Sequence, residues 1–266
     1  VQKTQPNEWA FFEKQNPVNP VRKFCTAFNN ACDADGLLSV LRYGFKHRGR
    51  RFRVCYFQPE SALNQKDAQR YAQNEITCNR QWFYSDTTHN SVDMVLAVNG
   101  IPVFAFELKN QFTGQTVENA KQQWMHDRDP REVCFQFNKR ILGYFCVDLT
   151  EVWMATRLAG KDTRFLPFNQ GSNGAGRDGG AGNPPNPNGY LTAYLWEEVF
   201  QKDSMMDSWT WCASWWQMCG KRVPGSTISS STAPGRASPT PLLGRRTDWL
   251  PCSTPRTSRC LPASSW

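Results

Sequence analysis

The step Asn99-Gly100 between two apolar runs is the feature that most constrains the fold of this 266-residue chain. Both residues tolerate positive φ, and such a dipeptide between apolar runs is a strong signal for a tight β-hairpin. We therefore expect DMVLAV before the step and PVFAFEL after it to be neighbouring antiparallel strands. The second run contains Val-Phe-Ala-Phe without polar alternation, which is typical of a strand buried on both faces.

The length of the loop decides which residues meet at the open end of this hairpin. A two-residue loop sets Asp93 opposite Phe106, whereas a three-residue or bulged loop sets Asp93 opposite Glu107. Directly opposed residues share a face of the sheet, so only the second register points Asp93, Glu107 and Lys109 the same way. We therefore predict a bulge, a three-residue loop or a bend at the strand end.

A glutamate and a lysine at the end of a buried strand indicate a site, because burying them is costly unless they are paired or bound to metal. Two neighbouring carboxylates, Asp93 and Glu107, form a hard oxygen site suited to Mg²⁺. The metal would lower the pKa of a bound water and polarise a scissile phosphate, and Lys109 would orient the water or stabilise the phosphorus. The alternative is a Glu-Lys pair that caps a sheet edge, since an Asp followed by Glu-x-Lys is by itself a weak pattern.

The surrounding pattern predicts an α/β core. Between Ser91 and Phe168, apolar runs surround one helix-like segment, Val117–His126, which we expect to be a crossover helix. The strand-like runs are DMVLAV, PVFAFEL, EVCFQF, LGYFCV and VWMAT. Before this core we expect helices over Pro20–Cys32 and Gly36–Tyr43 and a strand over Arg51–Phe57.

Composition divides the chain into four regions. Residues 1–170 form the expected globular domain, and the Gly, Pro and Asn content of 171–189 predicts a loop or linker. Residues 190–207 predict an amphipathic helix. Residues 208–266 are rich in Ser, Pro and Trp without sustained periodicity, and we interpret them as an irregular tail. Its origin is either an out-of-frame translation or a natural interaction tail.

The formal net charge of +8 is weak evidence for nucleic-acid binding by residues 1–207, because the tail carries most of it. The local cluster around His47 is more informative: five cations there could neutralise DNA phosphates, with Phe52 packed beneath. They are Lys46, Arg48, Arg50, Arg51 and Arg53. A solvated basic turn between helix and strand is the alternative.

The sequence lacks the signals of membrane proteins, zinc fingers, serine hydrolases and ATP-binding phosphate loops. The sequence has no apolar run of about 18–20 residues and no signal peptide, which favours a cytoplasmic protein without a membrane partner. The ten cysteines lack zinc-finger spacing, and the three histidines accompany no nucleophile elbow. No G-x-x-x-x-G-K-[ST] phosphate loop occurs, so ATP-driven translocation is not expected here.

Several separated motifs together resemble the N-terminal region of type I restriction enzyme R subunits over residues 8–207. They are SVDMVLAVNGIPVFAFELKNQFTGQTVENA, DRDPRE, VWMATRLAGKDTRFLPFNQG, GAGNPPNPNGY and TAYLWEEVFQKDS. The resemblance implies a restriction-endonuclease-like PD-(D/E)xK core, with a mixed sheet flanked by helices, in residues 1–170. Asp93, Glu107 and Lys109 would be its catalytic residues, and Asp93 and Glu107 would hold Mg²⁺.

The resemblance also implies partners. A nuclease of this family cuts double-stranded DNA in a complex with methyltransferase and specificity subunits, and ATP serves the motor of the full-length subunit. We expect that motor, and a segment before Val1, to be missing from this chain. Two alternatives remain: a catalytically silent DNA-binding or assembly module, and a DNA repair nuclease of the same fold.

Residues after Glu-x-Lys are further candidates. The family carries a Gln/Tyr signature in its next helix, which implies that Gln122, Gln123 and Trp124 contact DNA or the active site, with Trp124 at the expected tyrosine. Arg128 follows this helix as a candidate DNA contact. For Arg128 and Arg131, ion pairs with the neighbouring aspartates are the alternative.

Overall fold

A mixed six-stranded sheet forms the centre of the protein. The computed structural model describes residues 1–61, 63–85, 88–171 and 181–211, so the predicted tail beyond 211 lies outside the described residues. The strands follow the order β3(Ile76–Phe83), β4(Ser91–Val98), β5(Ile101–Leu108), β6(Gly143–Val147), β7(Val152–Ala155) and β8(Leu166–Pro167). β5 and β6 are parallel, and every other neighbouring pair is antiparallel. The predicted α/β class with a mixed sheet is confirmed.

The β4–β5 hairpin has a tight turn and a bulge. Asn99 and Gly100 both have positive φ, 53° and 81°, as the sequence predicts. The register changes next to the turn, because Leu96 pairs with Phe104 whereas Ala97 pairs with Pro102. Val103 is therefore the extra residue of a β-bulge, which confirms the predicted register shift.

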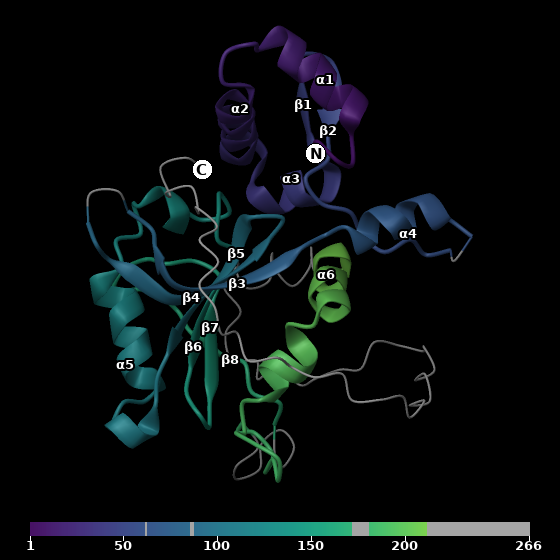
Figure 1. The fold of residues 1–266 in the computed structure, drawn as a ribbon. Coiled ribbons are helices and arrows are strands. Elements are labelled where there is room, and N and C mark those ends of the chain that lie inside the picture. Colours follow the sequence, from purple (N-terminus) through teal and green to yellow (C-terminus); the bar gives the residue numbers. More distant parts are fainter. Residues whose placement is uncertain (62, 86–87, 172–180, 212–266) are drawn as a thin grey trace.

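Each face of the sheet has its own apolar core. On one face, Val95, Ala105 and Tyr144 pack under α5(Val117–Gln122) and the π-helical turn η2(Gln123–Asp127). On the other face, Phe106 and Phe145 pack with residues of η4(Leu195–Val199) and α6(Lys202–Trp211). Figure 1 shows α5 and α6 on opposite sides of the strands. The sheet is thus buried on both faces, as the unbroken apolar run of β5 predicts.

Most of the N-terminal third lies above the sheet in Figure 1 and shares an apolar core with the face that packs against η4 and α6. It contains α1(Pro6–Gln15), α2(Pro20–Asp35), α3(Leu37–Tyr43), β1(Phe45–His47), β2(Arg50–Phe52) and α4(Gln65–Ala72). α1 and α2 each begin with proline, which suits a first helical position. Edge-to-face contacts among Phe12, Phe24 and Phe52 pack α1 and α2 onto β2.

Some sequence predictions for these elements are correct and others are not. The helices expected over 20–32 and 36–43 correspond to α2 and α3, and the crossover helix corresponds to α5 and η2. EVCFQF is not a strand: it forms a 3₁₀ turn at Val133–Phe135 whose buried Phe135 packs against Tyr144 and Trp124. The strand expected over 51–57 ends at Phe52, and the helix expected over 190–207 is split between η4 and α6.

Asp148 joins the end of β6 to the start of α5. Its Oδ1 accepts hydrogen bonds from the Thr150 and Glu151 amides, 2.7 and 2.8 Å away, and from the Thr150 hydroxyl. Its Oδ2 accepts from the Val117 amide at 3.1 Å. Burial alone would raise the pKa of Asp148, but these hydrogen bonds outweigh it and lower the pKa.

Replacing Asp148 by alanine should destabilise the fold. The change leaves the Val117, Thr150 and Glu151 amides without their partner, so we expect urea unfolding to show a loss of about 1–3 kcal/mol at pH 7. Because the folded pKa is depressed, the wild-type advantage is present at neutral pH and should shrink as pH falls below about 4. Asp129→Ala, at an exposed position, is the control and should change stability by less than about 0.5 kcal/mol. A wild-type advantage that persists unchanged at pH 2 would contradict the assignment.

Candidate functional site

The bulge brings the predicted triad to one face at the open end of the β4–β5 hairpin. Met94 pairs with Phe106, and the same register sets Asp93 opposite Glu107. The Asp93 Oδ2 accepts a hydrogen bond from the Leu108 amide at 2.9 Å and lies 4.0 Å from the Lys109 Nζ. Asp93 therefore ties the start of β4 to the end of β5 and to the lysine that follows it.

Burial differs sharply within the triad. The Glu107 side chain is completely buried and that of Lys109 is 6% exposed, whereas that of Asp93 is 30% exposed. The Lys109 amide donates to the Val147 carbonyl at 2.8 Å, so the parallel neighbour β6 fixes the lysine backbone beyond the end of β5. A ligand would therefore approach the site from the Asp93 side.

Arg128 supplies the positive charge next to Glu107. Its Nε and Nη2 atoms lie 3.0 and 2.7 Å from the Glu107 Oε1. Burial raises the pKa of Glu107 to about 7, the guanidinium of Arg128 opposes this rise, and the nearby charge of Asp93 adds to it. The two carboxylates are thus close enough to resist being ionised together, as expected for groups that share a cation.

The donor set of the site fits a small divalent cation. Asp93 and Glu107 offer carboxylate oxygens on one face, and within the described part of the chain no hydrogen-bond donor reaches the buried Glu107 Oε2. Mg²⁺ commonly takes one or two protein carboxylates and completes its shell with water and substrate phosphate. Residues 1–61, 63–85, 88–171 and 181–211 contain no cluster of three or more His, Cys, Asp or Glu side chains suited to a metal. Asp93 and Glu107 are the two carboxylates that could hold such a cation at this end of the hairpin.

The four candidate residues that follow Glu-x-Lys differ in how deeply they are buried. Gln122 is exposed, and Gln123 is half-buried with an Oε1 that has no hydrogen-bond partner. Trp124 is 0% exposed and donates its indole N–H to the Phe145 carbonyl at 3.2 Å. It is a core residue rather than the DNA contact expected from the sequence, because no part of its ring reaches the surface. Arg128 is also buried, against Glu107.

Ion pairs with neighbouring aspartates are the alternative predicted for Arg128 and Arg131, and this is correct for Arg131 only. Arg131 pairs with Asp129, with its Nη2 2.8 Å from the Asp129 Oδ2. Arg128 pairs with Glu107 instead of Asp127 or Asp129. Since Arg128 and Glu107 are far apart in the sequence, no local spacing indicates this contact.

The basic cluster lies on the β1–β2 hairpin, away from the triad. Asn99 donates to the Val54 carbonyl, so β2 leads into the sheet at the turn end of β4. Asp93 is six residues along β4 from this point, or about 20 Å. The structure therefore does not bring the basic cluster and the carboxylates together.

The cluster itself is available to solvent. Lys46, Arg48, Arg50, Arg51 and Arg53 are all exposed, and Phe52 is buried beneath them as predicted. None of the five forms an ion pair with a described acidic side chain. Burial and the adjacent Arg48 lower the pKa of His47, which favours its neutral form.

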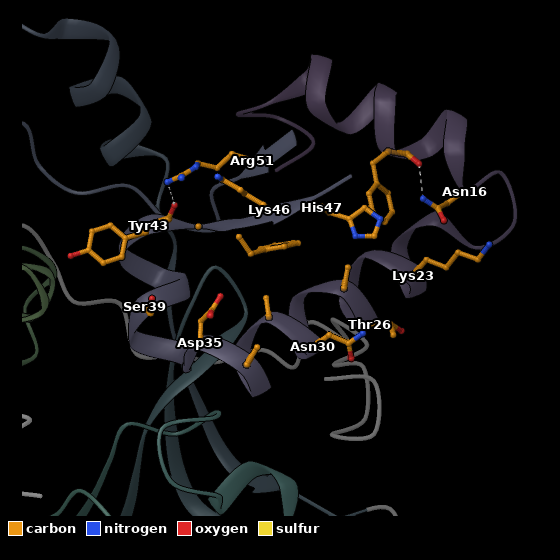
Figure 2. A pocket seen from close by; sticks show the side chains of 16 residues that line it. Asn16, Lys23, Thr26, Asn30, Asp35, Ser39, Tyr43, Lys46, His47 and Arg51 are labelled. Carbon is orange, nitrogen blue, oxygen red and sulfur yellow. Dashed lines mark hydrogen bonds between the residues drawn. The ribbon is translucent and has the colours of Figure 1, made fainter. Parts of the chain in front are cut away.

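A hollow of about 790 Å³ opens beside this hairpin, between β1 and the helices α2 and α3. Figure 2 shows Lys46, His47 and Arg51 on one side of it and Thr26 and Asn30 on the other. The triad residues do not line it. The hollow therefore belongs to the basic hairpin and not to the carboxylate site.

Gln81, on the neighbouring strand β3 beside Asp93, has a strained backbone conformation. The sequence gives no signal of this strain. Gln81 has a φ of 50° and interrupts the β3–β4 pairing between Arg80–Met94 and Trp82–Val92. Its Oε1 accepts a hydrogen bond from the Ser91 hydroxyl at 3.1 Å. A non-glycine residue in this conformation is uncommon and costly, and such residues gather at functional sites.

These features define an α/β protein with a carboxylate–lysine cluster at the end of a bulged hairpin in a mixed sheet. Residues 8–171, more than half of the chain, match the family described as the type I restriction enzyme R protein N terminus. The chain belongs to this family. No curated protein and no solved structure matches the chain. Among the helices of the described residues, none has both the length and the apolar character to cross a bilayer.

Truncating Trp124 should test its reassignment to the core. We expect Trp124→Ala to lower the free energy of unfolding by about 3–5 kcal/mol, because it leaves a cavity beneath Tyr144 and Phe135. Gln122→Ala, two residues earlier and exposed, should change it by less than about 0.5 kcal/mol. Urea titration of both variants provides the measurement. Equal stabilities would mean that Trp124 does not hold α5 and η2 on the sheet.

Proposed function

We propose that this domain is the Mg²⁺-dependent DNA endonuclease of a type I restriction R subunit. The observation that carries the proposal is the juxtaposition of Asp93 and Glu107 on one face, with the Lys109 ammonium 4.0 Å from the Asp93 Oδ2. Membership of the R protein N-terminal family supports a restriction enzyme over an unrelated repair nuclease. The PD-(D/E)xK assignment rests on this residue pattern and on the order of its elements.

Asp93 and Glu107 would hold the cation. When bound, Mg²⁺ supplies Lewis-acid polarisation of the phosphate and acidifies a water molecule. The more exposed Asp93 faces the approaching phosphodiester, and the Leu108 amide fixes its orientation. The buried Glu107 cannot leave this face, because Arg128 and the sheet enclose it.

Lys109 contributes a second positive charge to the reacting phosphate. Its side chain is almost buried and its backbone is fixed by β6, so its ammonium is held near Asp93 rather than free in solvent. A fixed ammonium in a dry site stabilises developing negative charge more than a solvated one does. It also has the position to orient the attacking water.

The basic hairpin would hold the duplex backbone. Its five exposed cations lie beyond the turn end of β4, and this turn is about 20 Å along the strand from Asp93, a length of about six base pairs of duplex. A duplex that passes both regions would place one phosphate at the carboxylates and others at the hairpin. Such contacts position DNA without reading its sequence.

Sequence recognition and ATP use would belong to other parts of the complex. We infer that methyltransferase and specificity subunits select the DNA and that an ATP-dependent motor region controls cutting, as the family assignment suggests. The isolated domain should then cut DNA slowly and without sequence preference.

One observation favours a silent DNA-binding or assembly module as the second candidate. Arg128 already balances the charge of Glu107, so the site can be stable without metal. The two functions differ in a direct assay of phosphodiester cleavage.

Substitutions in the triad should slow nicking strongly. We expect the chain to nick supercoiled plasmid with Mg²⁺ or Mn²⁺, and Asp93→Asn and Lys109→Ala to reduce the rate by at least about 10²-fold, as for loss of one transition-state contact. Asp129→Asn, which removes an acidic charge outside the triad, is the control. Gel quantification of nicked plasmid gives the rates. Equal nicking by all four proteins would reject the catalytic assignment, and no nicking by any of them would favour the silent module.

Neutralising the basic hairpin should weaken DNA binding and reduce its salt dependence. If Lys46, Arg50 and Arg53 each contact a phosphate, changing all three to Gln should make the slope of the log of the DNA-binding constant against log salt less negative by about 3. A triple variant with the same net charge, Lys66→Gln, Lys161→Gln and Arg164→Gln, is the control at exposed positions elsewhere. Fluorescence anisotropy with a labelled duplex measures both slopes. If both variants lost the same salt dependence, the effect would come from net charge and not from contacts made by the hairpin.

A further inference from the structure

Arg128 connects the two strands that carry the carboxylates. Its Nη2 donates to the Glu107 Oε1 on β5 at 2.7 Å and to the Ser91 carbonyl on β4 at 2.8 Å, and its Nε donates to the same Oε1 at 3.0 Å. Ser91 begins β4, two residues before Asp93. The guanidinium therefore spans the end of the hairpin where the candidate metal ligands lie.

The contact between Arg128 and Glu107 is one-sided. In the usual fork-to-fork pair, each carboxylate oxygen receives one N–H. Here both donors converge on Oε1, and no hydrogen-bond donor among the described residues reaches the buried Oε2. A buried carboxylate oxygen without a partner is costly, so its presence points to a ligand at Oε2.

Arg128 is itself held in place. It follows η2, where Trp124 anchors the chain through its hydrogen bond to the Phe145 carbonyl. The guanidinium carbon lies 5.7 Å from the centre of the Tyr84 ring, and the side chain is only 9% exposed. Arg128 cannot leave Glu107 for DNA unless this packing is broken.

We propose that Arg128 is a positioning residue for the divalent cation: it holds the Glu107 Oε1 so that Oε2, on the face shared with Asp93, is free to bind the metal. This role rests on the proposed metal centre at Asp93 and Glu107. Partners that orient a metal ligand from behind commonly change metal affinity 10- to 100-fold when they are removed.

A competing role for Arg128 has the opposite consequence. If the guanidinium occupied the place of the metal, its removal would tighten metal binding. The geometry favours positioning, because a substitute cation would engage the oxygen that the metal needs, whereas Arg128 leaves Oε2 untouched. The sign of the change in metal affinity therefore separates the two roles.

Calorimetric titration of the full chain with Mn²⁺ tests the proposal. We expect Arg128→Met to bind Mn²⁺ about 10- to 100-fold more weakly than the wild type. Arg128→Lys retains the charge but loses the planar fork, so its affinity should lie between the two. Arg131→Met removes an arginine from the same segment, whose ion pair within the described residues is with the surface residue Asp129, and should bind like the wild type.

Stability and binding must be separated. Tyr71→Phe breaks the hydrogen bond to Asp203, which joins α4 to α6 away from the site, and serves as a destabilised control whose Mn²⁺ affinity should not change. If Arg128→Met does not fold, the comparison of Arg128→Lys with Arg131→Met decides: weaker binding by Arg128→Lys supports positioning, and equal or tighter binding overturns it.

The experiment distinguishes failure of the positioning role of Arg128 from failure of the proposed metal centre. Unchanged or tighter Mn²⁺ binding by Arg128→Met, with binding lost in Asp93→Asn, overturns the role of Arg128 and leaves the proposed metal centre intact. Binding that Asp93→Asn does not weaken, or no binding by any chain, overturns the metal centre and with it the positioning role. The proposed positioning role requires weak binding in both Arg128→Met and Asp93→Asn.

Discussion

The β-bulge at Val103 is the constraint on which the candidate site depends. The turn at Asn99 and Gly100 alone sets a register that points Asp93 and Glu107 to opposite faces. One extra residue in β5 shifts the pairing and brings both carboxylates to the α5 face. Pro102, which has no amide hydrogen, lies beside the bulge, where the ladder is already irregular. A local departure from ideal pairing thus defines the chemistry at the far end of the same hairpin.

Burial and charge oppose each other at that end. Glu107 lies on a central strand of the sheet, where an isolated carboxylate would be costly, and Arg128 compensates from the end of the crossover. Asp93 and Lys109 form a second, looser pair nearer the surface. The four side chains are two acids and two bases, so each acidic group has a basic partner before any ligand arrives. A cation and a phosphate that bind together would preserve this balance, which suits a site that acts on DNA.

The sequence predicts the centre of the fold better than its periphery, for physical reasons. Asn99-Gly100 and the apolar run of β5 are local signals that predict the hairpin. They leave a bulge, a three-residue loop or a bend as ways to bring the triad to one face, and the structure shows the bulge. β3 escaped prediction because it is an edge strand with many polar residues. EVCFQF resembles a strand, yet its aromatic residue fills a gap beneath Tyr144 as part of a turn. The contact of Arg128 with Glu107 joins distant segments, so no local pattern could indicate it.

The same contact has a consequence for how the domain folds. The face that holds Glu107 is covered by α5 and η2, so docking of this crossover is the step that buries the carboxylate. An unpaired buried charge is strongly destabilising, and Arg128 directly follows η2, so the cover and the compensating cation arrive together. A crossover docked in another position would bury Glu107 without its cation, so the contact penalises misplaced packing of α5 and η2.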